Sequence, residues 1–127
     1  MDHRVERVNA QLRQELAEVL RRDVKDPHVD AAGVVSVSCS PDLGQARVRI
    51  SVLGDDEGQR RATVSRLQRM AGFLRGRLRD RLPHLRRVPQ LRFQLDESIG
   101  YAVRVNRILA GLEPEERSAG PSGEGQS

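Results

Sequence analysis

Cysteine is almost absent from this sequence, and its scarcity excludes two ways in which small proteins are stabilised. Cys39 is the single cysteine among 127 residues. One thiol cannot form an internal disulfide, and Cys39 with only His3, His28 and His84 to help cannot build a zinc site. We therefore expect no metal site, and no motif in the chain predicts another cofactor.

Long apolar runs are missing too. No stretch approaches the roughly 20 apolar residues that cross a bilayer, and the opening segment MDHRVERVNA lacks the apolar part of a signal peptide. We expect a soluble, cytoplasmic protein that does not bind membranes. A length of 127 residues suits one domain with a modest core, and no internal repeat is visible.

Catalytic signatures are also absent. The sequence has no Walker A loop, and no Rossmann glycine pattern follows a predicted strand. His3, His28 and His84 fall in the first predicted helix, just past its end and after Pro83, where surface roles explain them. We expect neither enzyme activity nor a small-molecule substrate.

Arginine, in contrast, is abundant and concentrated in one third of the chain. Residues 60–95 contain one acid, Asp80, and eleven arginines, at positions 60, 61, 66, 69, 75, 77, 79, 81, 86, 87 and 92. This segment carries +10 (eleven less one), and because the whole chain carries +4, the rest carries −6. A concentrated field of one sign attracts a polyanion, whereas a merely solvated helix face normally mixes signs. Nucleic acid is therefore the leading partner class.

The same segment predicts a bent helix that ends at Pro83. A core-facing stripe recurs at spacings of three and four, at Val64, Leu67, Ala71, Leu74, Leu78 and Leu82. Small residues and arginines share the opposite side. Glycine inside a helix costs on the order of 1 kcal/mol relative to alanine, so Gly72 and Gly76 need a reason to be there. We expect a bend at Gly72 where another backbone comes close. Phe73 has two alternatives: an exposed stacking residue on the basic face, or a residue that the bend tucks into the core, which is the one we favour.

Alternating apolar residues predict three strands, at residues 35–39, 46–52 and 91–95. The turn Pro41-Asp42-Leu43-Gly44 joins the first two, which should pair antiparallel. The third returns after a helical crossover and should lie parallel to the second. Cys39 is predicted to be a small buried residue. Phosphate contact and simple solvation explain Arg47 and Arg49 equally well.

Two further helices flank these elements. Residues 3–23 predict an amphipathic helix with Asp2 available as its N-cap and Pro27 beyond its end. A last helix, capped by Asp96 or Ser98, has a predicted buried stripe of Tyr101, Ala102, Val105, Ile108, Leu109 and Leu112.

The predicted fold is α+β. Its order is helix, strand, strand, bent helix pair, strand and helix around a three-stranded mixed sheet, as in a type II KH domain. We expect residues 1–112 to form this domain. Residues 113–127, rich in glycine, serine and glutamate, predict a disordered tail.

Aromatic residues are too few for bases to stack across a sheet. Phe73, Phe93 and Tyr101 are the only aromatics, and Phe93 and Tyr101 fall on inward stripes. This excludes the stacking sheet of RRM and cold-shock domains. RNA recognition would therefore rest on phosphate contacts, helix ends and shape.

Short matches in the right order resemble the ribosome-binding factor A family, KH-like bacterial ribosome-assembly factors. They are Arg4 and Arg7, Lys25-Asp26-Pro27, Ser40 to Ala46, Gly72-Phe73-Leu74-Arg75, Pro89-Gln90-Leu91-Arg92-Phe93 and Asp96-Glu97-Ser98. The GXXG loop of KH domains is absent. Met70 stands where the family usually has alanine, Gln90 where it commonly has glutamate and His28 where it often has arginine.

The resemblance implies a non-catalytic monomer that binds the free small (30S) ribosomal subunit late in its maturation. It further implies contact with ribosomal RNA near the neck and decoding region, support of 5′-end processing, importance for growth in the cold, and departure before initiation. Two alternatives stay open. One is a general KH-like RNA-binding module, and the other is a protein-interaction domain whose basic helix docks an acidic partner.

We predict that RNA phosphates are held by arginines of the bent helix and the loop after it: Arg66, Arg69, Arg75, Arg77, Arg79, Arg86 and Arg87. Gly72 and Gly76 would let the RNA backbone come close to the helix. Such phosphate contacts predict binding that weakens steeply with salt.

Overall fold

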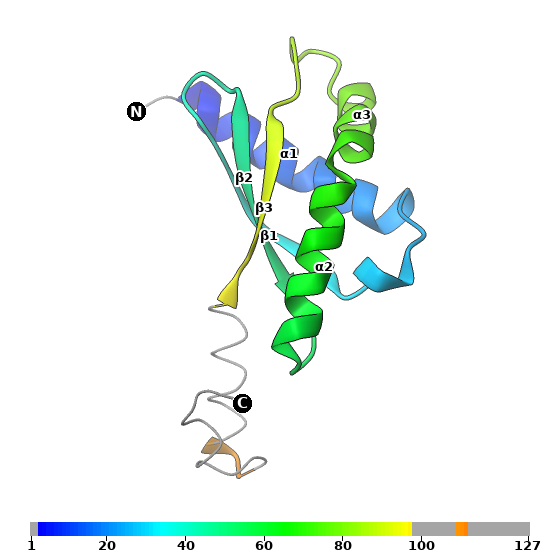
Figure 1. Ribbon diagram of the computed structural model, residues 1–127. Helices are drawn as coiled ribbons and strands as arrows, with labels where there is room; N and C mark the ends of the chain where they lie inside the picture. The colour runs from blue at the N-terminus through cyan, green and yellow to red at the C-terminus, as the bar shows by residue number, and fades with distance from the viewer. Residues whose placement is uncertain (1–2, 98–108, 112–127) are drawn as a thin grey trace. The chain divides into compact units, whose positions relative to one another are not determined.

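The elements follow the predicted order through the third strand. The computed structural model describes residues 3–97 and 109–111. Along the chain these residues form α1 (His3–Arg22), the 3-10 turn η1 (Pro27–Val29), β1 (Ala32–Cys39), β2 (Gln45–Val52), α2 (Glu57–Arg69), α3 (Ala71–Arg81) and β3 (Gln90–Leu95) (Figure 1).

The chain forms two compact units, residues 1–96 and 97–127. All the named helices and strands belong to the first unit. The predicted last helix and the predicted tail lie outside the described residues, apart from 109–111. Within the described residues, no helix is both long and apolar enough to cross a membrane.

The three strands form the predicted mixed sheet in the order β1-β2-β3. β1 is antiparallel to β2, and β2 is parallel to β3. In this register Arg47 on β2 lies between Ser38 on β1 and Arg92 on β3. A register shift between Val34 and Ser36 interrupts β1, which explains why regular alternation appears only in its second half.

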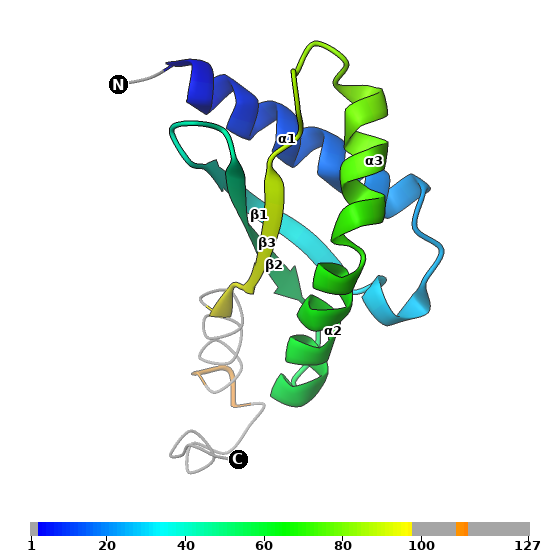
Figure 2. The same ribbon diagram turned by 45° about the horizontal axis from the view of Figure 1, so that its top comes forward.

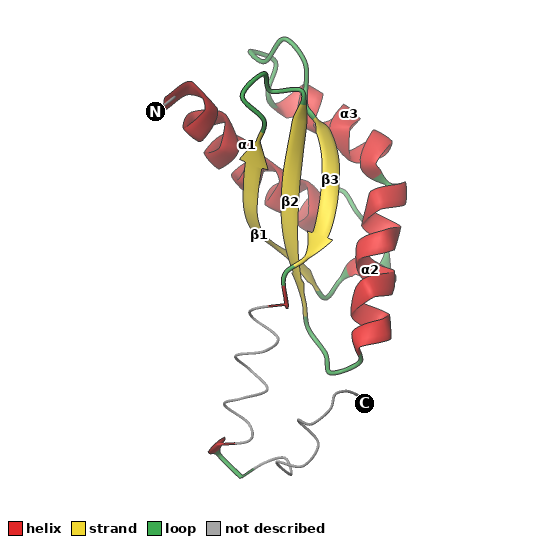
Figure 3. Cartoon of the chain, turned by 60° about the vertical axis from the view of Figure 1, so that its left-hand side comes forward, coloured by secondary structure: helices red, strands yellow, loops and turns green. Residues whose placement is uncertain are grey.

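One face of the sheet holds the core. Figure 3 shows α1 and α3 behind the sheet, while none of the described helices covers the opposite face, which we call the open sheet face. Ala46, Val48 and Ile50 of β2 are completely buried on the covered face, because side chains alternate between the two faces of a strand. Cys39 points into the same core, as predicted, and burial raises the pKa of its thiol to about 11.

α1 is amphipathic, as predicted, and ends one residue before the predicted residue 23. Its buried residues are Val8, Leu12, Leu16 and Val19. The helix stops at Arg22. Beyond it, the Asp26 side chain accepts a hydrogen bond from the His28 backbone N–H over 3.0 Å and so caps η1. Proline at the start of η1 suits this cap, since a first helical position needs no N–H donor.

The bend in the basic helix lies at Met70, so the prediction of a bend at Gly72 is wrong. Met70, with φ −91° and ψ 4°, separates α2 from α3. Its side chain packs against the core, while α2 follows β3 and α3 crosses α1 (Figure 2). A straight helix could not follow both surfaces.

The expected close approach of another backbone at Gly72 is also wrong. A Cβ atom added at Gly72 or Gly76 would meet no neighbouring atom within 4 Å. Phe73 does not enter the core either, because the break precedes it and leaves it on the solvent side of α3, 50% exposed. The guanidinium of Arg77 lies 5.9 Å from the centre of its ring.

Candidate RNA-binding surface

The predicted arginines divide into those with partners inside the protein and those that face solvent. Arg66 belongs to the first group: its Nε donates to Oδ2 of Asp26, which joins α2 to the end of the α1–η1 connection. This hydrogen bond, with the His28 backbone N–H, lowers the pKa of Asp26 to about 2. Arg66 therefore has a structural role, although 42% of its side chain stays exposed.

Arg75 is held even more closely by the fold. Its Nη2 donates to the carbonyl of Val88 over 2.8 Å, and its Nε donates to the carbonyl of Pro89 over 3.1 Å. Val88 and Pro89 are buried immediately before β3. Arg75 thus fixes the end of the α3–β3 loop against α3.

Arg77 connects α3 to the end of α1. Its Nε donates to Oδ2 of Asp23 over 3.1 Å, and Nη2 of Arg81 lies 3.8 Å from the same oxygen. The hydrogen bond from Arg77 is the main cause of the lowered pKa of Asp23. Because Arg77 also lies over Phe73, it is positioned but only partly neutralised, with 47% of its side chain exposed.

Arg69, Arg79 and Arg86 form the second group. All three are exposed, and none forms an ion pair or a side-chain hydrogen bond with a residue that the structure describes. Arg87 is exposed as well, and its charge contributes to the lowered pKa of Asp42, after hydrogen bonds from Ser40 and Gly44. These side chains are available to an outside anion.

A strip of open backbone runs between two of these arginines. Gly72, Gly76 and Arg79 follow at spacings of four and three, so they share one face of α3. Arg69 precedes this face at the end of α2. The two glycines leave space for a ligand's backbone to approach the helix, with exposed guanidinium groups before and after it.

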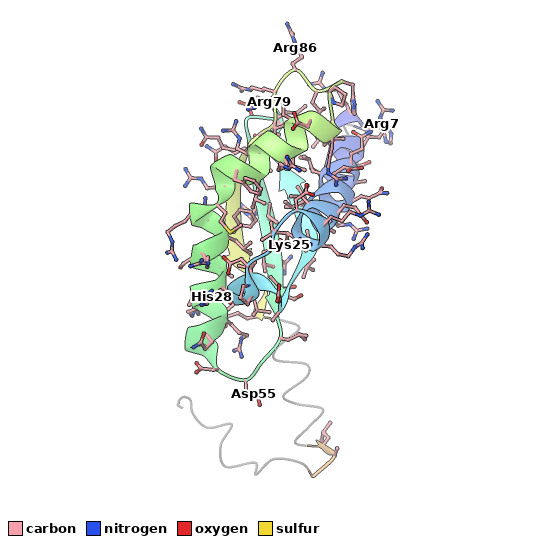
Figure 4. All side chains as sticks on the ribbon, turned by 90° about the vertical axis from the view of Figure 1, so that its right-hand side faces the viewer. Arg7, Lys25, His28, Asp55, Arg79 and Arg86 are labelled. Carbon is pink, nitrogen blue, oxygen red and sulfur yellow. The ribbon has the colours of Figure 1, made fainter. Side chains whose placement is uncertain are left out.

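Two arginines outside the predicted site lie close to Arg86 and Arg87 in the unit of residues 1–96. Arg4 and Arg7 of α1 surround a cavity of about 640 Å³ together with Arg86 and Arg87. Figure 4 shows Arg7, Arg79 and Arg86 at one end of this unit and Asp55 at the other. The only feature of the sequence that pointed to Arg4 and Arg7 was their spacing of three residues early in the first predicted helix.

The open sheet face carries a separate arginine pair. Arg47 and Arg92 are register partners on the parallel strands β2 and β3, and both are exposed. Arg49 on the same face lies 3.3 Å from Oδ1 of the buried Asp96. The structure therefore assigns Arg49 a partner within the fold, whereas Arg47 faces outward beside a like charge.

The fold and this surface define a KH-like α+β protein with an arginine-rich helical side. Among the residues that the structure describes, no three histidine, cysteine, aspartate or glutamate side chains gather as a metal site would require. Residues 4–109 match the family described as ribosome-binding factor A. The chain belongs to the ribosome-binding factor A family, as the resemblance in its sequence indicated.

Relatives with this name match nearly the whole chain. Ribosome-binding factor A of Roseiflexus castenholzii is 40% identical over 121 residues, which are 95% of this chain and 92% of the relative. The protein of the same name from Roseiflexus sp. strain RS-1 is 42% identical over 121 residues, with the same two coverages.

Solved structures agree in fold. The crystal structure of ribosome-binding factor A from Thermus thermophilus matches with a TM-score of 0.60 and 30% identity, over 72% of this chain and 94% of that one. A homology model of the Thermus thermophilus protein, fitted into a cryo-EM map of its 30S complex, matches with a TM-score of 0.56 and 30% identity, over 70% of this chain and 91% of that one.

Proposed function

We propose that this protein is an assembly factor for the small ribosomal subunit. It binds the free 30S subunit through ribosomal RNA late in maturation, promotes processing of the 5′ end of that RNA, and leaves before initiation. It acts as a non-catalytic monomer in the cytoplasm, and cells depend on it most during growth in the cold.

The observation that carries this proposal is the likeness to a protein fitted into a map of its 30S complex, at 30% identity and over 91% of that protein's chain. Likeness of fold alone would not transfer a partner. The local charge of this chain adds a physical reason, because a segment of +10 in a chain of net +4 favours a polyanionic surface such as ribosomal RNA.

Only some of the predicted residues belong to the proposed contact surface. Phosphates are held chiefly by Arg69, Arg79, Arg86 and Arg87, which are exposed. Gly72 and Gly76 leave space for the RNA backbone between Arg69 and Arg79. Arg66, Arg75 and Arg77 support the same surface from within, because each already donates to another part of the chain.

Co-sedimentation with separated small subunits, large subunits and whole ribosomes tests the proposal. The informative variant is Arg69→Glu/Arg79→Glu, which reverses two exposed charges on the helical side. Arg47→Glu/Arg92→Glu is the matched control, because it changes the net charge equally on the open sheet face. Both variants should keep the wild-type melting temperature, since neither pair has a partner among the described residues.

We expect the wild-type protein and the sheet variant to pellet selectively with free small subunits and the helix variant to stay in solution. Equal losses in both variants would show that general charge, rather than this surface, drives binding. Equal pelleting of the wild type with all RNA-containing particles would leave a general RNA-binding module. Binding that survives nuclease treatment would support the acidic protein partner.

Salt dependence gives a second test of phosphate contact. The logarithm of affinity should fall with the logarithm of salt concentration by roughly 0.7 to 0.9 per phosphate neutralised. The slope should be shallower in Arg69→Glu/Arg79→Glu than in the wild type, because fewer phosphates are neutralised. A slope near zero in the wild type contradicts the proposed mode of binding.

The maturation role is tested in cells. We expect cells that lack the protein to accumulate small-subunit RNA with an unprocessed 5′ end and to grow slowly in the cold. The sheet variant should restore both, and the helix variant should restore neither. Normal 5′ ends in cells without the protein would contradict a role in processing.

A further inference from the structure

A cavity of about 640 Å³ lies where α1, the β1–β2 turn and the α3–β3 loop meet. Its size falls within the roughly 300–1,000 Å³ of pockets that hold small ligands. His84 helps to close it, since its Nε2 lies 3.2 Å from Oε1 of Gln11 and joins the loop to α1. The cavity is separate from the glycine strip on α3.

The walls of the cavity are strongly basic. Arg4, Arg7, Arg86 and Arg87 line it, and Asp42 is its one acidic residue. These five residues carry a net charge of +3, four less one. Oδ1 of Asp42 already accepts hydrogen bonds from Ser40 Oγ and the Gly44 N–H, over 2.7 and 3.0 Å. Asp42 therefore shapes the turn and leaves an excess of positive charge for an anion.

The same cavity also has an apolar side, which a simple phosphate does not need. Val8 is buried beneath it, and Leu43 and Leu85 pack against the core while lining it. An apolar surface beside several guanidinium groups suits a molecule with a flat, weakly polar part and an anionic part. A nucleotide has both, and guanidinium planes stack on bases as aromatic rings do.

Leu43 is held in a strained conformation at the edge of this cavity. Its φ of 59° makes it the only described non-glycine residue with a positive φ. Leucine is unfavourable there, and strain of this kind clusters at sites of function. Asparagine or glycine would adopt this turn conformation at lower cost in free energy. The chain has leucine instead, and its aliphatic side chain lines the basic cavity.

We infer that this cavity receives one unstacked nucleotide of the RNA, with its base against Leu43, Leu85 and Val8 and its phosphate among the four arginines. The inference rests on the proposed function for its RNA partner. It adds a base-contacting site to a surface that otherwise reads only phosphates. The site adds an aliphatic base contact to a chain that has only three aromatic residues.

Two probes of similar charge separate base contact from phosphate contact. One is a ten-nucleotide single-stranded RNA of mixed sequence, and the other is inorganic polyphosphate of ten phosphates. In the full-length protein, methyl resonances of Leu43 and Leu85 should shift with the RNA and not with polyphosphate. Arg7→Glu/Arg86→Glu should weaken the binding of both probes.

The decisive variant is Leu43→Asn. Asparagine adopts positive φ readily, so the turn is expected to fold, while the apolar contact with the base is lost. RNA affinity should fall by about tenfold, the scale of one base contact, with polyphosphate affinity unchanged. Leu53→Asn is the matched control because Leu53 is 80% exposed and lies outside the cavity. If Leu43→Asn does not fold, Leu85→Ser is measured in its place, because Leu85 also lines the cavity.

Unchanged RNA affinity in the folded variant, or equal losses for RNA and polyphosphate, would overturn the nucleotide site and leave a basic patch only. The outcome is independent of the co-sedimentation test. A wild-type protein that selects small subunits while Leu43→Asn binds RNA normally keeps the proposed function and removes the pocket. If the wild-type protein binds RNA through the base but does not select small subunits, the nucleotide site stands and the proposed function is removed.

Discussion

The side chain of Gln68 on α2 forms two hydrogen bonds with the backbone of β3, at Leu91 and Phe93, as a neighbouring strand would. The Phe93 backbone N–H donates to Oε1 of Gln68 over 2.9 Å, and Nε2 of Gln68 donates to the carbonyl of Leu91 over 2.9 Å. β3 lies at the edge of the sheet, where unpaired backbone groups are open to pairing with other chains. One side chain from the basic helix pair thus covers the middle of that edge.

Replacing Gln68 should destabilise the protein without changing its charged surface. Gln68→Ala leaves the Phe93 N–H and the Leu91 carbonyl without their partner, which we expect to cost about 1–3 kcal/mol of unfolding free energy. Denaturant unfolding measures this loss. Gln94→Ala, an exposed change on the same strand, should stay within about 0.5 kcal/mol of the wild type. Equal stability of the two variants would contradict a role for Gln68 at the edge.

Arg75 and Arg79, four residues apart on α3, should behave in opposite ways. Arg75→Ala removes two hydrogen bonds to the carbonyls of Val88 and Pro89 and should lower the unfolding free energy by about 1–3 kcal/mol. Arg79→Ala should leave stability within about 0.5 kcal/mol and weaken small-subunit binding. Thermal unfolding and co-sedimentation of both variants measure the contrast. A stable Arg75→Ala protein would show that the loop does not depend on Arg75.

Asp26 should make stability depend on pH in the acid range. The hydrogen bond from Arg66 and then the His28 N–H lower its folded pKa to about 2 from an ordinary 3.8. A lowered carboxyl pKa stabilises the folded state above the unfolded pKa, and this contribution is lost as pH falls through the folded pKa. The loss should therefore develop from pH 3.8 down to about 2.

Unfolding of the wild type and Asp26→Asn at several pH values tests this expectation. The difference in unfolding free energy between them should be largest near neutral pH and shrink across the acid window. Asp30→Asn, an exposed change in the same connection, controls for general charge. A constant difference between the wild type and Asp26→Asn at all pH values would rule out the linkage.

Alanine at Gly72 and Gly76 should separate stability from binding. A Cβ atom at either position meets nothing within 4 Å, so each change should raise the unfolding free energy by about 0.5–1 kcal/mol through helix propensity. Small-subunit binding should nevertheless weaken, because the added methyl groups occupy the space proposed for the RNA backbone. Ser65→Ala on α2 controls for propensity alone. Unchanged binding in Gly72→Ala/Gly76→Ala would show that RNA does not approach this strip.

Cys39 should resist thiol reagents in the folded protein. Burial raises the pKa of its thiol to about 11, and the thiolate is the reactive species. At pH 8 we expect negligible labelling without denaturant and complete labelling of the chain in denaturant, which serves as its own control. Rapid labelling of the folded protein would mean that β1 opens readily at its end.

Periodicity was sufficient for most of the fold. Alternation over residues 46–52 and 91–95 predicted two strands whose observed bounds, Gln45–Val52 and Gln90–Leu95, differ by one residue at their starts. The position of the bend was a different matter. Gly72 was the expected place because glycine weakens a helix locally, but the chain turns at Met70, whose side chain packs against the core. Tertiary packing decided the position over local propensity.

The roles of the arginines could not be assigned from the sequence. Arg66, Arg69 and Arg75 are the same residue type in one basic segment, and all three were predicted to hold phosphates. Asp26, the partner of Arg66, lies 40 residues away, and the Val88 carbonyl bound by Arg75 lies 13 residues away. No local pattern connects such positions. Arg4 and Arg7 were likewise separated from Arg86 and Arg87 until the fold placed them around one cavity.

The sequence by itself determined the charge of the basic segment, the period of each strand and of α1, and the family, because these depend on residue types and their order. The tertiary structure decided which arginines remain available, where the helix pair bends, that Phe73 faces solvent and that a cavity exists. The physical reason is that hydrogen bonding and burial compete for each side chain. The outcome depends on partners that only folding brings within reach.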